Sequence, residues 1–131
     1  MAGFSTYLET ALLNWIKGAA MPAAPAAVYV ALFSADPTDS GTGGTEVTTT
    51  VRTGGRLVAT FGPVSARTIS NSAIVDFGNA AAAATVSHFG LFDAASAGNL
   101  LLTASIAGGA QAINAGNPVS FAAGALSVSV D

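Results

Sequence analysis

The sequence predicts a mainly β fold: an antiparallel β-sandwich or jelly-roll-like domain with one N-terminal α-helix. From about residue 46 onward, short runs of β-forming residues are separated by turn residues, at roughly the 8–12-residue spacing typical of sandwiches and barrels. Helical spacing of apolar residues is clear before residue 18. We therefore expect an N-terminal arm at residues 1–26 and a β-sandwich domain at residues 27–131.

The helix is expected at about residues 6–17. Thr6 and Glu9 fit a capping box, in which the two side chains accept hydrogen bonds from backbone N–H groups at the start of a helix. Apolar residues then recur at the spacing of one helix face, namely Leu8, Leu12 and Trp15. Two interpretations stay open: the helix covers one end of the sandwich, or it docks into a groove of a neighbouring subunit with these residues as anchors.

A linker is expected at residues 18–26. Gly18 suits the left-handed position that ends many helices. Pro22 and Pro25 cannot continue a helix and favour extended backbone before them. A proline-bounded linker of this kind would allow the helix to act as an arm.

The last predicted strand has the clearest pattern. Leu126, Val128 and Val130 alternate with Ser127 and Ser129, so one face should be buried and the other in contact with water. The other strands are predicted from β-forming residues between turn signals. All expected strands together lie at residues 27–33, 46–52, 57–61, 73–77, 85–92, 100–106, 111–114, 118–121 and 125–130.

Turn-forming residues mark the loops. Asp36 opens a loop rich in Gly and Thr that runs to residue 46, and Asp93 opens a turn that ends at Asn99. The alanine-rich stretch at residues 79–84 is too short for an independent helix, so we expect a loop or a single turn there.

The chain carries little charge. Four Lys and Arg stand against seven Asp and Glu, and charged residues make up 8% of the chain, whereas about 25% is usual in soluble domains. So few cations cannot contact many phosphates, and neither nucleic acid nor a membrane surface is expected as a partner. Because 51% of the residues are hydrophobic, we expect another subunit to cover much of the surface. The alternative is a monomer rich in Ala and Gly.

No catalytic, cofactor-binding or metal-binding residue is expected. The chain has no cysteine, which excludes thiol catalysis, disulfides and Cys-based zinc sites. His88, the single histidine, is expected in or beside the core and hydrogen-bonded to backbone. A Ser-His-Asp triad with Asp93 is formally possible, but no G-x-S-x-G elbow occurs. We interpret the scattered carboxylates as turn and cap residues rather than as a glycosidase pair or a calcium site.

Three arginines, Arg52, Arg56 and Arg67, are the basic residues that follow the predicted helix. They could contact acidic groups of a neighbouring subunit, because Arg is enriched at protein interfaces, or they could be isolated surface residues. Together with the helix anchors, we take Arg52 and Arg56 as candidate partner-docking residues. No signal peptide or membrane span is recognisable, so we expect synthesis in the cytoplasm.

A set of short motifs occurs in order along nearly the whole chain. The motifs are Tyr7-Leu8-Glu9 with Leu12-Leu13, Val28-Tyr29-Val30-Ala31-Leu32-Phe33, Asp36-Pro37, Gly44-Thr45-Glu46-Val47, Ser70-Asn71-Ser72-Ala73, Thr85 to Ala94, Gly98-Asn99-Leu100-Leu101, Ile113 to Asn117, Phe121 to Gly124 and Leu126 to Asp131. In their order and spacing they resemble a family of small bacteriophage virion proteins, usually labelled tail-fibre-like or structural proteins. The resemblance implies a virion protein without enzymatic activity, made in the host cytoplasm. Its expected partners are other virion proteins and further copies of itself, with a trimer favoured.

Within this family we expect a capsid decoration or cement protein, which binds the head lattice and stabilises it because it binds only the assembled shell. The alternative is a tail-fibre or baseplate accessory protein involved in host attachment. A third possibility is a hydrolase of cell-wall or capsule polysaccharide. That activity would need paired carboxylates in a cleft, and the sequence does not locate such a pair.

Overall fold

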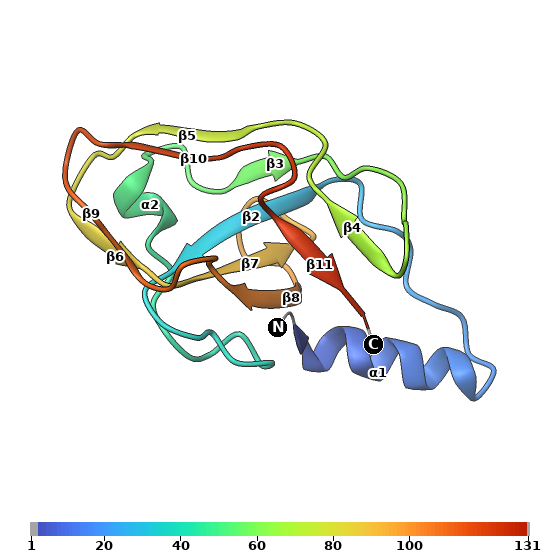
Figure 1. Ribbon diagram of the computed structural model, residues 1–131. Coiled ribbons are helices and arrows are strands. Elements are labelled where there is room, and N and C mark those ends of the chain that lie inside the picture. The colour runs from blue at the N-terminus through green and yellow to red at the C-terminus, as the bar shows by residue number, and fades with distance from the viewer. Residues whose placement is uncertain (1–2, 131) are drawn as a thin grey trace.

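The computed structural model describes residues 3–130 and is mainly β, with antiparallel strands and an N-terminal helix (Figure 1). The predicted fold class is therefore confirmed. In chain order the elements are β1 (Gly3–Phe4), α1 (Thr6–Ile16), β2 (Val28–Phe33), α2 (Thr48–Val51), β3 (Leu57–Ala59), β4 (Thr68–Ser70), β5 (Val75–Asn79), β6 (Ala84–Val86), β7 (His88–Phe92), β8 (Leu100–Ser105), β9 (Gln111–Ile113), β10 (Pro118–Phe121) and β11 (Ser127–Ser129).

The largest sheet has five strands in the order β1-β8-β7-β2-β3, and each neighbouring pair is antiparallel. Three two-stranded pairs, β10-β5, β11-β4 and β6-β9, complete the fold. In Figure 1 the β5–β10 pair runs above the five-stranded sheet, and α1 lies along the opposite, lower edge of the molecule. The arrangement is sandwich-like, with the helix outside the two layers.

The main core lies between the five-stranded sheet and the smaller pairs. Its buried side chains alternate along each strand, because successive residues of a strand point to opposite faces. The five-stranded sheet and the smaller pairs both contribute, with Val30, Leu32, Phe89, Leu91, Leu102, Val75, Phe77, Val119, Leu126 and Val128 among the members. Burying each of these side chains contributes about 1.5–3 kcal/mol, so this core holds the two layers together.

The other face of the five-stranded sheet is also buried. Ala31, Phe33, Phe92 and Leu100 form a second, smaller cluster there. The loop after β2 lies against it, since a Cβ built on Gly41 would be 3.4 Å from the Leu100 side chain. A strand buried on both faces needs apolar residues at every position. This explains why residues 28–33 show no polar alternation.

The predicted strand at residues 46–52 is wrong, because residues 48–51 form the short helix α2. Strand β3 covers β2 only at residues 28–30, so the N–H of Leu32 lacks a strand partner. The Thr48 hydroxyl oxygen accepts that N–H at 2.7 Å, and Val47 donates its N–H to the Leu32 carbonyl at 2.8 Å. Buried backbone groups must be paired, and the helical turn pairs them with a side chain instead of a strand.

The predicted strand at residues 85–92 is two strands, β6 and β7, which separate at Ser87. The Ser87 N–H donates to the Phe33 carbonyl and its hydroxyl to the Ser34 carbonyl, both at 2.9 Å. Beyond this residue the chain changes sheets, with β6 paired to β9 and β7 paired to β2. The other expected strands each overlap an observed one, whereas β1 and β4 lie outside every predicted strand.

The loops follow the predicted turn chemistry. The Asp36 carboxylate accepts a hydrogen bond from the N–H of Thr38 at 2.8 Å, and the Asp93 carboxylate accepts one from the N–H of Asn99 at 2.7 Å. The side chain of Asn99 also donates to Asp93, and this hydrogen bond is the main reason that the pKa of Asp93 is lowered. The carboxylate therefore serves to close the turn.

Candidate functional site

The start of α1 is fixed to the five-stranded sheet through Ser5. This buried residue is the N-cap, and its hydroxyl accepts a hydrogen bond from the N–H of Leu8 and donates to the carbonyl of Leu100. Its own N–H donates to the carbonyl of Leu101 at 3.0 Å. The predicted cap at Thr6 is therefore wrong by one residue, because the hydroxyl that reaches both the helix and β8 belongs to Ser5.

The rest of α1 packs on the fold through a narrow stripe. Ala11 is the helix residue that is fully buried, while Leu8 is half-buried. Large apolar side chains on the other sides stay exposed: Leu13 and Ile16 at 67% each, Trp15 at 57% and Leu12 at 37%. The apolar side chains of a helix in a globular protein normally face the core. The exposed part of α1 is thus a candidate contact surface for another protein.

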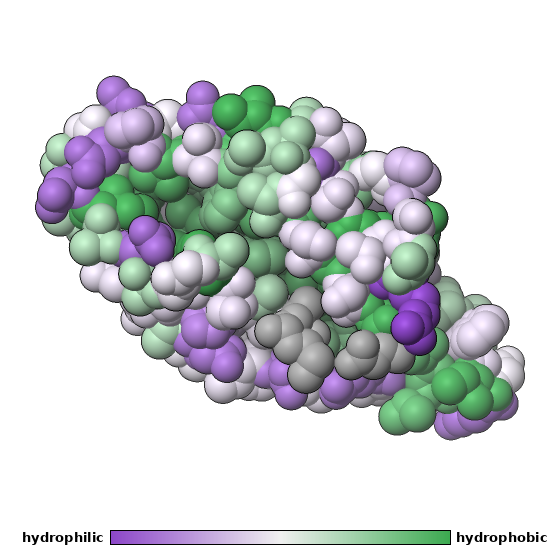
Figure 2. Space-filling view, viewed as in Figure 1, coloured by the Kyte–Doolittle hydropathy of each residue, from purple (hydrophilic) through white to green (hydrophobic). Residues whose placement is uncertain are grey.

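One helical face carries most of this exposed apolar surface. Glu9, Leu12, Leu13 and Ile16 follow the i, i+3, i+4, i+7 spacing of a single face, which we call the outer face of α1. In Figure 2 hydrophobic colour gathers over the free end of α1 and the linker, at the lower right of the view. The sequence had indicated Leu12 and Trp15 but missed Leu13 and Ile16, although the same spacing rule applied to Glu9 would have found them.

Arg56, a predicted docking residue, is enclosed within the chain. Its Nε and Nη2 donate to the two carboxylate oxygens of Glu46 at 2.9 and 2.8 Å, and its Nη1 donates to the carbonyls of Ala94 and Ala97 at 3.0 and 2.8 Å. The guanidinium also lies 3.6 Å from the centre of the Phe92 ring, and the side chain is 8% exposed. Arg56 thus joins three loops over the second core cluster.

The other two arginines lie apart from each other. Arg52 is half-buried and donates from Nη1 to the carbonyl of Gly55 at 3.1 Å, within its own turn. Arg67 is exposed at the turn that precedes β4. The structure therefore brings neither Arg52 nor Arg56 onto the outer face of α1, and their role in docking stays a prediction.

An apolar groove of about 310 Å³ lies beside the start of α1, and we call it the side groove. It is lined by Phe4, Leu8, Val28, Phe61, Val64, Arg67, Ile69, Leu91, Leu101, Leu102, Val128 and Val130. Among these residues Arg67 alone is charged. Val64 and Val130 are 73% and 41% exposed, so the groove opens at the surface.

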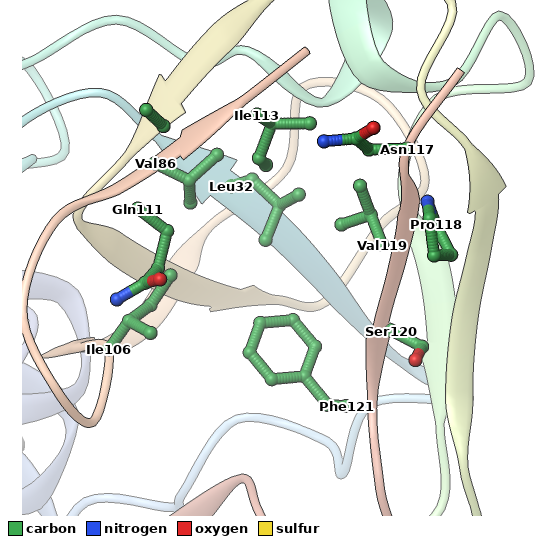
Figure 3. Close-up of a pocket in the computed structure, with 11 residues that line it drawn as sticks. Leu32, Val86, Ile106, Gln111, Ile113, Asn117, Pro118, Val119, Ser120 and Phe121 are labelled. Atoms are coloured by element: carbon green, nitrogen blue, oxygen red, sulfur yellow. The ribbon is translucent and has the colours of Figure 1, made fainter. Parts of the chain in front are cut away.

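A second hollow of about 310 Å³ lies at the other end of the sandwich, between β2, β6, β9 and β10 (Figure 3). Leu32, Val86 and Val119 form its buried floor, and Phe121 lies at one side. The amide side chains of Gln111 and Asn117 lie at its margins and are exposed. The hollow is an apolar depression with a polar margin. Among the described residues no charged side chain lines it, and Ser120 contributes a hydroxyl to its lining.

His88 lies at a third, more polar hollow, with Asp36 and Asp39 among the other lining residues. Its Nδ1 is 2.9 Å from the hydroxyl of Ser87. His88 was expected to form a hydrogen bond with the backbone, but its ring is hydrogen-bonded to the side chain of Ser87. The Ser87 hydroxyl already donates to the carbonyl of Ser34. The Asp93 carboxylate accepts a hydrogen bond from Asn99 rather than from His88. Ser87, His88 and Asp93 are therefore not assembled into a triad.

Within residues 3–130 no three His, Cys, Asp or Glu side chains are grouped so that they could hold a metal ion. Across the same residues, no helix is both long and apolar enough to cross a bilayer.

The chain matches a known protein family. The family described as Podophage GP4 fiber I protein gp80 matches residues 3–129, which is nearly the whole chain. No match was found among curated proteins.

Proposed function

The chain belongs to the Podophage GP4 fiber I protein gp80 family, and we propose that it is a non-enzymatic structural subunit of a phage tail fibre. Membership of a phage fibre family makes it a virion structural protein that interacts with other virion proteins. The family description supports the fibre location. The observation that supports contact with a neighbouring subunit is the outer face of α1, which exposes Leu13 and Ile16 at 67% each. Such a face suits a protein that works by packing against a neighbouring subunit.

The sequence placed head decoration first and a tail-fibre or baseplate role second. The family match favours the second, because its description names a fibre protein. The structure fits either location, since an exposed apolar helix can pack against a fibre subunit or a shell subunit. The proposal therefore takes the fibre as the location and keeps the predicted contact with other subunits.

Burial of the outer face would supply the binding free energy. Full burial of a Leu or Ile side chain contributes about 1.5–3 kcal/mol, and Leu12, Leu13 and Ile16 lie within two turns of one helix. Contacts of this size compete with the entropy lost on association, which several buried anchors together can offset. The fixed start of α1 helps, because a helix held at Ser5 loses less freedom on binding.

Inactivation of the gene in the phage tests the location. We expect particles with filled heads that lack one set of fibres and adsorb poorly to host cells, with both defects restored by the wild-type gene. A Leu13→Asp, Ile16→Asp variant should fail to restore them, whereas Thr10→Ala, an exposed substitution on the same helix, should restore them. Complete fibres together with heads that lose DNA on mild heating would instead support decoration of the shell.

A further inference from the structure

The side groove and the outer face of α1 are chemically complementary. The outer face offers three apolar side chains with one carboxylate, Glu9, one turn earlier. The groove offers apolar walls and one guanidinium, that of Arg67. Glu9 and Arg67 are both exposed, and neither makes an ion pair within residues 3–130. Opposite charges at the edge of an apolar contact steer association and set its register.

Arg67 is held at the groove by an unfavourable turn. Ser65 and Thr68 exchange backbone hydrogen bonds at 3.0 and 2.9 Å, so the two residues between them form a tight hairpin turn. These residues are Ala66 and Arg67, with φ of +48° and +62°. Such turns favour Asn and Gly, because a side chain in the left-handed region is strained by about 1–2 kcal/mol. Strained residues persist where they have a function, and here the strain places a cation beside an apolar groove.

We infer that the partner of α1 is a second copy of this chain, and that Leu12, Leu13 and Ile16 of one copy enter the side groove of the next, with Glu9 paired to the next copy's Arg67. The inference rests on the proposed function in one respect, since it names the partner of the same helix face. The contact is head-to-tail, because helix and groove are different surfaces of one chain. Head-to-tail contacts close into rings when the rotation permits, which agrees with the predicted trimer.

Mixing two interface variants of the purified chain tests this contact. The helix variant carries Leu13→Asp and Ile16→Asp, and the groove variant carries Val64→Asp, which alters a residue that is 73% exposed. Light scattering after size-exclusion chromatography should show an oligomer for the wild type and a monomer for each variant. An equimolar mixture should form a one-to-one dimer, because one intact helix meets one intact groove. Circular dichroism checks that both variants are folded.

Several outcomes would overturn the inference. A wild-type chain that stays monomeric at the highest soluble concentration would do so. So would a groove variant that still self-associates, which would indicate a symmetric helix-to-helix contact or a different surface. A mixture that remains monomeric would also contradict a head-to-tail contact. Because only the purified chain is used, these outcomes do not depend on where the protein lies in the particle.

The ion pair has its own test. Glu9→Lys and Arg67→Glu should each weaken self-association about tenfold or more at low salt, since like charges then meet, and the two changes combined should restore it. Arg67→Gly should raise the thermal midpoint by relieving the strained φ but weaken association. Ala66→Gly should raise the midpoint and leave association unchanged. If Arg67→Gly associates like the wild type, or the charge swap fails to restore binding, the Glu9–Arg67 pair is not part of the contact.

Discussion

Arg56 provides the sharpest test of how the loops over the second core cluster are held. Replacing it with Ala removes both hydrogen bonds to Glu46, leaves the carbonyls of Ala94 and Ala97 without their partner, and uncovers the Phe92 ring. These contacts lie in a site where the arginine side chain is 8% exposed and that of Glu46 is 29% exposed. The ion pair is therefore partly shielded from water and only weakly screened by salt.

The expected loss follows from this burial. Removal of one partner of a buried ion pair typically lowers the free energy of unfolding by 3–5 kcal/mol, and we expect about 3 kcal/mol because Glu46 retains some contact with water. Arg56→Lys should lose about 1–2 kcal/mol, since an ammonium keeps the charge but cannot bind both carboxylate oxygens or stack on Phe92. Arg52→Ala, which removes one hydrogen bond to Gly55, should stay within about 1 kcal/mol.

Urea unfolding followed by circular dichroism measures these differences, provided that the slope with urea concentration is the same for all variants. The reasoning fails if Arg56→Ala loses no more than Arg52→Ala, because Arg56 would then be a surface residue available to a partner. A double-mutant cycle with Glu46→Gln separates the pair from the other contacts of Arg56. A coupling free energy near zero would show that Glu46 contributes nothing.

Thr48→Val should lower the free energy of unfolding by about 1–3 kcal/mol, because it leaves the buried N–H of Leu32 unpaired. Thr48→Ser keeps the hydroxyl acceptor and should lower the free energy of unfolding by less than about 1 kcal/mol. Equal losses for the two variants in urea unfolding would contradict this. Since the folded pKa of Asp93 is lowered, its stabilisation is present above its unfolded pKa, near 4, and is lost as the pH falls through the folded value. Asn99→Ala should raise that folded pKa in an NMR titration, and an unchanged value would rule out Asn99 as the main cause. Gly44→Ala should lower the thermal midpoint strongly, because a Cβ there would lie 2.5 Å from a backbone carbonyl oxygen at φ +61°, and an unchanged midpoint would show that the loop can adjust.

Local patterns predicted the elements whose stability is local. The helix at residues 6–16, the strand at residues 118–121 and the Asp-capped turns could all be read from spacing and turn chemistry. The terminal strand followed its alternation in part, since Leu126 and Val128 are buried but Val130 is 41% exposed. Val130 follows the end of β11 and lines the open side groove.

The failures come from contacts between distant segments. Residues 46–52 are rich in β-forming Thr and Val, but the unpaired N–H of Leu32 requires the Thr48 hydroxyl, and the helical turn brings it there. The turn before β4 could not be recognised, because Ala66 and Arg67 occupy positions that normally belong to Asn and Gly.

Candidate docking residues were predicted only in part, for a related reason. When the apolar residues of a helix extend over more of its surface than the fold can cover, its sequence does not show which of them the fold covers. The structure shows that Leu8 and Ala11 pack against the rest of the fold, whereas Leu13 and Ile16 are exposed to solvent. For Arg56, no local pattern signals that Glu46, ten residues earlier, is its partner. The division into an arm at residues 1–26 and a domain at residues 27–131 stays a prediction, although β1 is part of the main sheet.

Electron cryo-microscopy of the intact particle, with this chain built into the density, tests the proposed role most directly. We predict that the chain lies in a tail fibre, with Leu12, Leu13 and Ile16 of each copy buried against a neighbouring subunit. Copies spread over the head lattice would contradict the fibre assignment. Copies in a fibre whose α1 outer face remains in solvent would contradict the docking surface on which the proposal depends.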